Sequence, residues 1–256
     1  MESRITGTTM PVLEIGLEPG ETIIAEPGEL SWMTPTVQLR TTTATAGARG
    51  LWGAVTRAVA GGGLFMTEFS AQGGRGAVAF AAKIPGAIMP VQVQPGSGYM
   101  VHRNGFLCGT QGVELAIGFQ QSLGAGIFGG SGFIMQRVSG SGTAWVELGG
   151  EIVTNVLAPG EELLVHPGHV GMFEEQVSFD ITTIRGITNA LFGGDGLFLA
   201  RLRGPGQIWL QTLTMPSLAH GLAPYLGKEA TPSTTTATVE GGVAGAVLNS
   251  LFGNRS

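Results

Sequence analysis

The stretch Gly140-Ser141-Gly142-Thr143-Ala144-Trp145-Val146 decides the fold, because it recurs twice more along the chain. The other two copies are Gly74-Arg75-Gly76-Ala77-Val78-Ala79-Phe80 and Gly204-Pro205-Gly206-Gln207-Ile208-Trp209-Leu210. Each copy follows a short apolar run, at residues 63–66, 132–135 and 196–199. An apolar run, a Gly-x-Gly turn and a second apolar run are typical of two adjacent strands. The pattern therefore predicts a β-hairpin in each copy.

A second element recurs ahead of each of these copies, at residues 17–28, 93–104 and 157–168. Each instance contains a Pro-Gly pair, a short apolar run and a second turn. Proline fixes φ for the first turn position and glycine supplies a positive φ for the next, so a type II turn is expected. Since both elements keep their order, the chain is predicted to hold three units, approximately 10–86, 87–152 and 153–222.

Gly-interrupted stretches at residues 50–60, 111–123 and 181–192 are interpreted as short helices that pack on the sheets. The predicted fold is mainly β, with three pseudo-repeated units and short helices in one β-sandwich or barrel-like domain over residues 1–222. Residues 228–256 are rich in Thr and Gly, which is typical of a flexible tail. Apolar spacing between Val243 and Phe252 predicts a short helix near its end.

The composition limits the classes of function. The chain has 256 residues, of which 44 are Gly, 43% are hydrophobic and 12% are charged. Its formal net charge is -5, with two lysines and eleven scattered arginines, which argues against a nucleic-acid partner. Cys108 stands alone, which suits a reducing compartment. The N-terminus resembles neither a secretory signal nor a transit peptide, so a soluble cytoplasmic protein is expected.

One turn carries residues that could bind a metal. His166-Pro167-Gly168-His169 is followed by Glu174, and small β-barrel metalloenzymes of the cupin kind use two His and a Glu as ligands for zinc, iron or manganese. The cupin spacing is His-x-His, which points both rings to one strand face, whereas Pro-Gly separates His166 from His169 across a turn. The alignment also places His166 level with Glu26 and His102. Surface turn residues are the favoured interpretation, and a metal site formed by His166, His169 and Glu174 is the alternative.

The sequence resembles a known family at its two later glycine-turned copies. Gly-Ser-Gly-Phe-Ile at 130–134 with Gly-Ser-Gly-Thr-Ala-Trp at 140–145, and Gly-Asp-Gly-Leu-Phe at 194–198 with Gly-Pro-Gly-Gln-Ile-Trp-Leu-Gln at 204–211, are similar to the altered-inheritance-of-mitochondria protein 24 family. The resemblance covers about residues 10 to 222. It implies a double-stranded β-helix type of fold, related to the tryptophan-RNA-binding attenuation protein, and often a trimeric assembly. It implies no enzymatic activity, cofactor or catalytic residue.

We therefore expect a non-enzymatic scaffold or interaction protein that forms a homo-oligomer, specifically a trimer. Trp145 and Trp209 occupy equivalent positions in their copies, as do Phe133 and Phe198. These four aromatic residues are predicted to lie in the core or at a subunit interface. The segment from Val243 to Phe252 is a candidate contact for a protein partner or a membrane surface. The alternative function is a cupin-like metal-binding protein that uses His166, His169 and Glu174.

Overall fold

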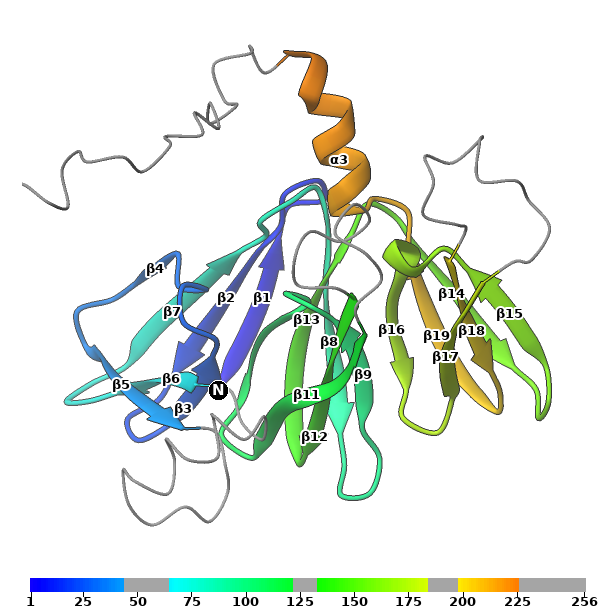
Figure 1. The fold of residues 1–256 in the computed structure, drawn as a ribbon. Helices are drawn as coiled ribbons and strands as arrows, with labels where there is room; N and C mark the ends of the chain where they lie inside the picture. Colours follow the sequence, from blue (N-terminus) through cyan, green and yellow to red (C-terminus); the bar gives the residue numbers. More distant parts are fainter. Residues whose placement is uncertain (44–64, 122–132, 184–197, 226–256) are drawn as a thin grey trace, which may run out of the picture. The chain divides into compact units, whose positions relative to one another are not determined.

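The computed structural model describes residues 1–43, 65–121, 133–183 and 198–225 (Figure 1). These residues form antiparallel sheets with few helices, so the mainly β fold predicted from the sequence is confirmed. Among the described strands, no sheet closes into a barrel. The predicted helix at 50–60 and the segment from Val243 to Phe252 lie outside the described residues. The chain divides into two compact units, Met1–Leu218 and Ala219–Ser256, and every described strand belongs to the first.

The strands form four sheets, which are listed here in their spatial order. The first sheet contains β1 (Glu2–Thr6), β2 (Val12–Leu17), β7 (Gly76–Ala81) and β4 (Trp32–Met33). The second contains β5 (Val37–Thr43), β6 (Phe65–Ala71), β3 (Thr22–Ala25), β10 (Phe106–Thr110), β13 (Gly142–Gly149) and β8 (Gly86–Val93).

The third sheet contains β11 (Val113–Gln121), β12 (Phe133–Gly140), β9 (Tyr99–His102), β16 (Val170–Glu174), β19 (Gly206–Gln211) and β14 (Ile152–Leu157). The fourth contains β15 (Glu162–Val165), β18 (Phe198–Arg203) and β17 (Ser178–Thr183). The remaining regular elements in the described residues are η2 (Pro167–His169), α3 (Met215–Leu222) and η4 (Ala223–Tyr225). None of these described helices is long and apolar enough to cross a membrane.

Each six-stranded sheet combines strands from two neighbouring units of the sequence alignment. Strand β3 of the first unit pairs with β10 of the second, and β9 of the second pairs with β16 of the third. We call these two contacts the internal junctions. The alignment places Trp32, Cys108 and Met172 at one position, and these residues pair with Ala79, Trp145 and Trp209 respectively. Equivalent strands of the three predicted units therefore pair in the same register.

The predicted hairpins are wrong. The two strands that flank each Gly-x-Gly turn do not pair, because they belong to different sheets. Strands β6, β12 and β18 lie in other sheets than β7, β13 and β19 respectively. At two of these turns the second glycine, Gly142 or Gly206, has a φ of 138° or 144°. A Cβ atom on Gly142 would collide with the Thr110 side chain, and one on Gly206 would lie 2.6 Å from Val177 Cγ2. These glycines carry the chain from one sheet into the next, where a neighbour leaves no room for a side chain.

The predicted helix at 111–123 is also wrong, since β11 occupies most of it. Val113 and Leu115 are buried while Glu114 between them is exposed, which is the alternation of a strand. The predicted helix at 181–192 begins inside β17 and otherwise lies outside the described residues. The Pro-Gly turns are confirmed by hydrogen bonds from the fourth turn residue to the carbonyl of the first, which join Glu21 to Glu18 at 3.0 Å, Ser97 to Gln94 at 2.9 Å and Glu161 to Ala158 at 2.9 Å.

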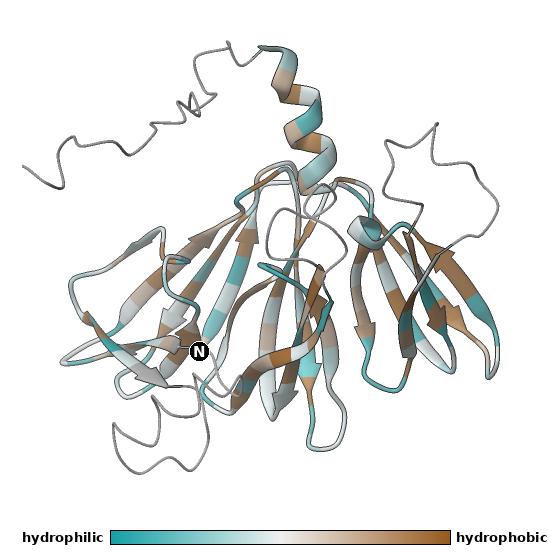
Figure 2. Cartoon of the chain, viewed as in Figure 1, coloured by the Kyte–Doolittle hydropathy of each residue, from teal (hydrophilic) through white to brown (hydrophobic). Residues whose placement is uncertain are grey.

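The core lies between the sheets, and hydrophobic residues are interspersed along the strands that enclose it (Figure 2). The buried apolar residues form three clusters among the described residues. Phe69 and Phe80 are fully buried in the first cluster, where their rings meet edge to face at 5.7 Å. Phe106 is buried in the second cluster and Phe173 in the third. The second cluster also includes Ile24 of the first unit. Each cluster contains residues from more than one unit, so neighbouring units share apolar clusters as well as sheets.

Candidate functional site

The histidine turn forms the short helix η2 and the residues around it. The Nδ1 atom of His166 accepts a hydrogen bond from the Gly168 amide at 3.3 Å, and the Nδ1 atom of His169 donates to the Gln211 carbonyl at 2.8 Å. The two ring centroids are 5.8 Å apart. Partial burial and the neighbouring His169 lower the pKa of His166. Both rings thus contribute to the hydrogen bonding of the turn.

The third residue of the metal alternative, Glu174, contacts the beginning of β19. Its Oε2 atom accepts hydrogen bonds from the Gln207 amide at 2.8 Å and from Gln176 Nε2 at 3.0 Å. Within the described residues, no three His, Cys, Asp or Glu side chains form a group that could hold a metal ion. A metal site at His166, His169 and Glu174 stays a prediction.

The four aromatic candidates occupy packing positions. Trp145 and Trp209 are buried, Phe133 is buried and Phe198 is half-buried. The rings of Tyr99 and Trp209 meet edge to face at 5.9 Å, and Phe133 stacks on Phe179 at 5.6 Å. These contacts serve the interior of the described chain. Cys108, the single cysteine, has no exposed surface, and burial raises its pKa well above the usual value.

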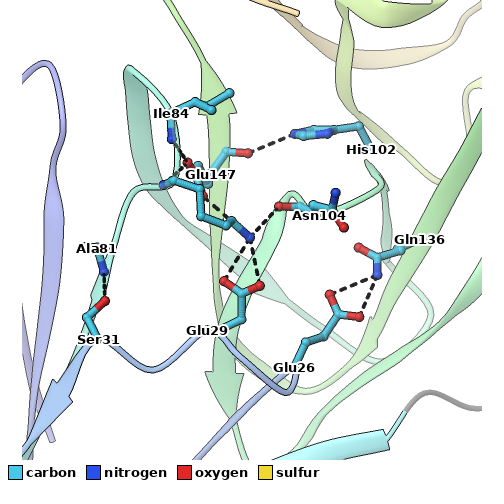
Figure 3. Close-up of polar contacts among 10 residues, drawn as sticks. Glu26, Glu29, Ser31, Ala81, Ile84, His102, Asn104, Gln136 and Glu147 are labelled. Carbon is cyan, nitrogen blue, oxygen red and sulfur yellow. Dashed lines mark hydrogen bonds and ion pairs between the residues drawn. The ribbon is translucent and has the colours of Figure 1, made fainter. Parts of the chain in front are cut away.

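Sequence reasoning missed a polar cluster at the first internal junction, formed by Glu29, Lys83, Asn104 and Glu147 (Figure 3). The Oε1 atom of Glu147 accepts hydrogen bonds from the Lys83 amide at 2.7 Å and from the Ile84 amide at 3.2 Å. The Lys83 ammonium donates to both carboxylate oxygens of Glu29, at 2.8 and 2.9 Å, and to the Asn104 carbonyl at 3.2 Å. The cluster therefore joins the first predicted unit to the second.

Burial controls the ionisation of this cluster. The Glu147 side chain is almost fully buried, and loss of hydration raises its pKa even though nearby Lys83 lowers it. Its Oε2 atom has no hydrogen-bond partner among the described residues and lies 3.9 Å from Lys83 Nζ. The Nε2 atom of His102 donates to the Glu147 carbonyl at 3.1 Å, and burial lowers the pKa of this imidazole. The imidazole thus contacts the main chain of Glu147, and no hydrogen bond joins it to the carboxyl among the described residues.

The contacts favour a structural role over catalysis. A depression of about 140 Å³ adjoins the cluster and is lined by Lys83, Ile84, His102, Arg103, Asn104, Glu147 and Met215. Pockets for small molecules generally occupy about 300–1,000 Å³. Glu147 Oε1 and His102 Nε2 both bind backbone groups, Oε1 at Lys83 and Ile84 and Nε2 at Glu147. These bonds fix the backbone segments that contain Lys83, His102 and Glu147 relative to one another. The arrangement holds neighbouring strands in place and leaves little space for a substrate.

A related contact occurs at the second internal junction. Gln211 stands at the aligned position of Glu147, and Gly149 at that of Lys83. The Gln211 Oε1 atom accepts from the Gly149 amide at 2.9 Å, and its Nε2 atom donates to the Gly168 carbonyl at 2.9 Å. Both buried polar side chains therefore bind the backbone at or just after the end of the preceding unit's last strand. The first unit has Ala81 at this position. Comparing the three aligned positions was the signal that could have revealed the contact.

Comparisons with known proteins agree with the fold. Residues 3–213 match the family model described as Mitochondrial biogenesis AIM24. An uncharacterised protein of Streptococcus pyogenes serotype M6 is 28% identical over 221 residues, which cover 84% of this chain and 87% of that protein. A crystal structure of protein SPYM3_0169 from Streptococcus pyogenes superposes with a TM-score of 0.69 at 25% identity, covering 88% of this chain and 99% of the other.

Proposed function

We propose, from the premise that this chain belongs to the mitochondrial biogenesis AIM24 family, that it is a non-enzymatic interaction protein that assembles with copies of itself. The observation that carries the proposal is a pair of exposed apolar residues on edge strands. Trp32 on β4 is 51% exposed and Leu164 on β15 is 49% exposed. Strand β4 pairs only with β7, and β15 only with β18, among the described strands. Open edges that carry large apolar side chains are typical of association surfaces.

The polar cluster supports the non-enzymatic part of the proposal. Glu147 and Gln211 both direct their side chains at backbone groups of the preceding unit. A catalytic carboxyl would need an open position where a substrate could meet it. The structural use of these groups favours a protein that acts through its surfaces. The trimer and the cytoplasmic location expected from the sequence belong to this proposal as its specific form.

Sedimentation velocity and native mass spectrometry of the full chain test the proposal. We expect an oligomer, with three copies as the predicted number, and a mass that falls toward one copy on dilution. A single copy at all concentrations would contradict the proposal. A variant that lacks residues 228–256 serves as a control, because edge strands β4 and β15 lie outside this tail. Loss of the oligomer in this variant would instead assign assembly to the tail segment between Val243 and Phe252, which lies outside the described residues.

A further inference from the structure

The two internal junctions show how one predicted unit binds the next. At each junction the second strand of one unit, β3 or β9, pairs with the third strand of the following unit, β10 or β16. The aligned strands at the two ends of the series are β15, which corresponds to β3 and β9, and β4, which corresponds to β10 and β16. We propose that β15 of one copy pairs with β4 of a second copy, head to tail. This inference rests on the proposed self-assembly and identifies its surface.

The register of the new contact follows from the internal junctions. Ala25 pairs with Cys108 at the first junction, and Val101 pairs with Met172 at the second. Val165 is the aligned counterpart of Ala25 and Val101, and Trp32 is that of Cys108 and Met172. Val165 of one copy then lies opposite Trp32 of the next. Leu164 lies opposite Met33 in the same antiparallel register.

Burial at these aligned positions supports the pairing. Cys108 and Met172 have no exposed surface inside the internal junctions, whereas Trp32 at the open end is 51% exposed. The size of the residue beside each of them on the neighbouring strand changes in the opposite direction. Small Ala79 lies beside Trp32, while large Trp145 and Trp209 lie beside Cys108 and Met172. Each pair thus contains one indole, and at the open end the indole is on the edge strand, where an incoming strand would cover it.

The other described sheet edges do not call for a partner in this way. Strands β5, β11 and β17 are the outermost strands beside β6, β12 and β18, and all three are free on that side. Strands β8 and β14 are also free, while their counterpart β2 is covered by β1. Among the described strands, only β4 and β15 are unpaired on the side where both of their counterparts pair with a strand of a neighbouring unit. The pairing pattern therefore points to β15 and β4 as the two edges that join.

The intermolecular contact would lack one feature of the internal junctions. Glu147 and Gln211 bind the preceding unit through buried side-chain hydrogen bonds, but Ala81 stands at the aligned position in the first unit. The Ala81 amide donates a hydrogen bond to the Ser31 hydroxyl oxygen at 2.8 Å, within the first unit. The end-to-end contact is then held by strand pairing and apolar burial alone. We expect it to dissociate on dilution while the internal junctions stay intact. An unlike pairing of this kind generates a ring or an open chain of copies.

Cysteine cross-linking tests the proposed register. Met33→Cys and Leu164→Cys proteins are prepared separately and then mixed with a short bis-maleimide reagent. We expect a covalent dimer in the mixture and none in either variant alone. Buried Cys108 should not react, which the wild-type protein checks. Val153→Cys replaces Leu164→Cys as the matched control, because Val153 is 48% exposed on edge strand β14 and no partner is proposed for it. Trp32→Cys mixed with Val165→Cys provides an independent pair in the same register.

The outcomes separate this inference from the function it rests on. A dimer in both cysteine mixtures, but not with Val153→Cys, supports the contact. A wild-type protein that sediments as an oligomer, without cross-links in either mixture, overturns the contact and leaves self-assembly standing. A wild-type monomer at all concentrations overturns both. A double variant, Met33→Cys with Leu164→Cys, that cross-links only within one chain replaces the contact between copies by closure of a single chain.

Discussion

Replacing Glu147 with alanine should destabilise the protein strongly, because it removes the acceptor shared by two backbone amides. The Lys83 and Ile84 amides donate to Glu147 Oε1 at 2.7 and 3.2 Å. A buried donor left without a partner costs about 1–3 kcal/mol. The gain from no longer burying a carboxylate offsets part of this cost, and water in the adjoining depression would offset more. We therefore expect a loss of about 2–4 kcal/mol in the free energy of unfolding.

Glu147→Gln separates the acceptor from the charge. Its amide oxygen can take the place of Oε1, so the loss at neutral pH should stay within about 1 kcal/mol. Burial raises the pKa of Glu147 above its usual value of 4.5, and the folded state therefore holds the proton to higher pH than the unfolded state. That contribution to stability is complete below the unfolded pKa and is lost as pH rises through the folded pKa. The glutamine variant should gain on the wild type over this interval.

Urea denaturation across this pH range measures both effects, with the slope of the transition checked for constancy. Glu175→Ala is the control, since Glu175 forms a largely exposed ion pair with Arg137 at 2.7 Å, worth at most about 1 kcal/mol. The reasoning fails if Glu147→Ala costs no more than Glu175→Ala. It also fails if the difference between the glutamine variant and the wild type is independent of pH.

Three further substitutions test other parts of the fold. Gly142→Ala should lower the free energy of unfolding, measured by urea denaturation, by about 2 kcal/mol or more, because φ is 138° there and the Thr110 side chain blocks a Cβ. Gly74→Ala is its control: no atom lies within 4 Å of the added Cβ, so the free energy of unfolding should change by less than about 1 kcal/mol. Trp145→Ala should cost about 3–5 kcal/mol by leaving a cavity in the first cluster, and a smaller loss in thermal unfolding would contradict its core role. Burial lowers the pKa of His102, so this histidine's contribution to stability is complete above the usual pKa of 6.5 and is lost as pH falls through the lower folded pKa. Urea denaturation should show that His102→Gln abolishes this part of the decline at acidic pH.

Local strand and turn signals predicted much of the fold from the sequence. The Pro-Gly pairs mark turns as expected, and the apolar runs around Trp145 and Trp209 are strands. The pairing of those strands could not be obtained in this way. A Gly-x-Gly turn brings two strands together along the chain, but the sheet that each joins depends on neighbours about one unit away. The pairing of Cys108 with Ala25 in the second sheet is one example, since these residues lie in different units.

The candidate site was harder to predict because its residues serve backbone groups rather than one another. Glu147 appeared as a single acidic residue within an apolar strand, and no motif links it to Lys83 or His102. The histidine turn contains the residue types of a cupin site, two His followed by a Glu, yet His169 contacts the Gln211 carbonyl. Reading the alignment column that contains Ala81, Glu147 and Gln211 would have drawn attention to a buried polar position. Its hydrogen-bond partners depend on how consecutive strands are distributed among sheets.

Because neighbouring units share sheets, the sheets can be completed only in a fixed order during translation. Strand β3 is made early, but its neighbour β10 begins only at Phe106, and the sheet that holds both is complete only when Gly149 has emerged. The next sheet needs Gln211 for the same reason. During synthesis, the most recently made unit therefore has an incomplete sheet until the strands of the following unit have been translated. The last sheet, formed by β15, β18 and β17, has no following unit to extend it in the described chain. In our proposal, strand β4 of another copy extends it.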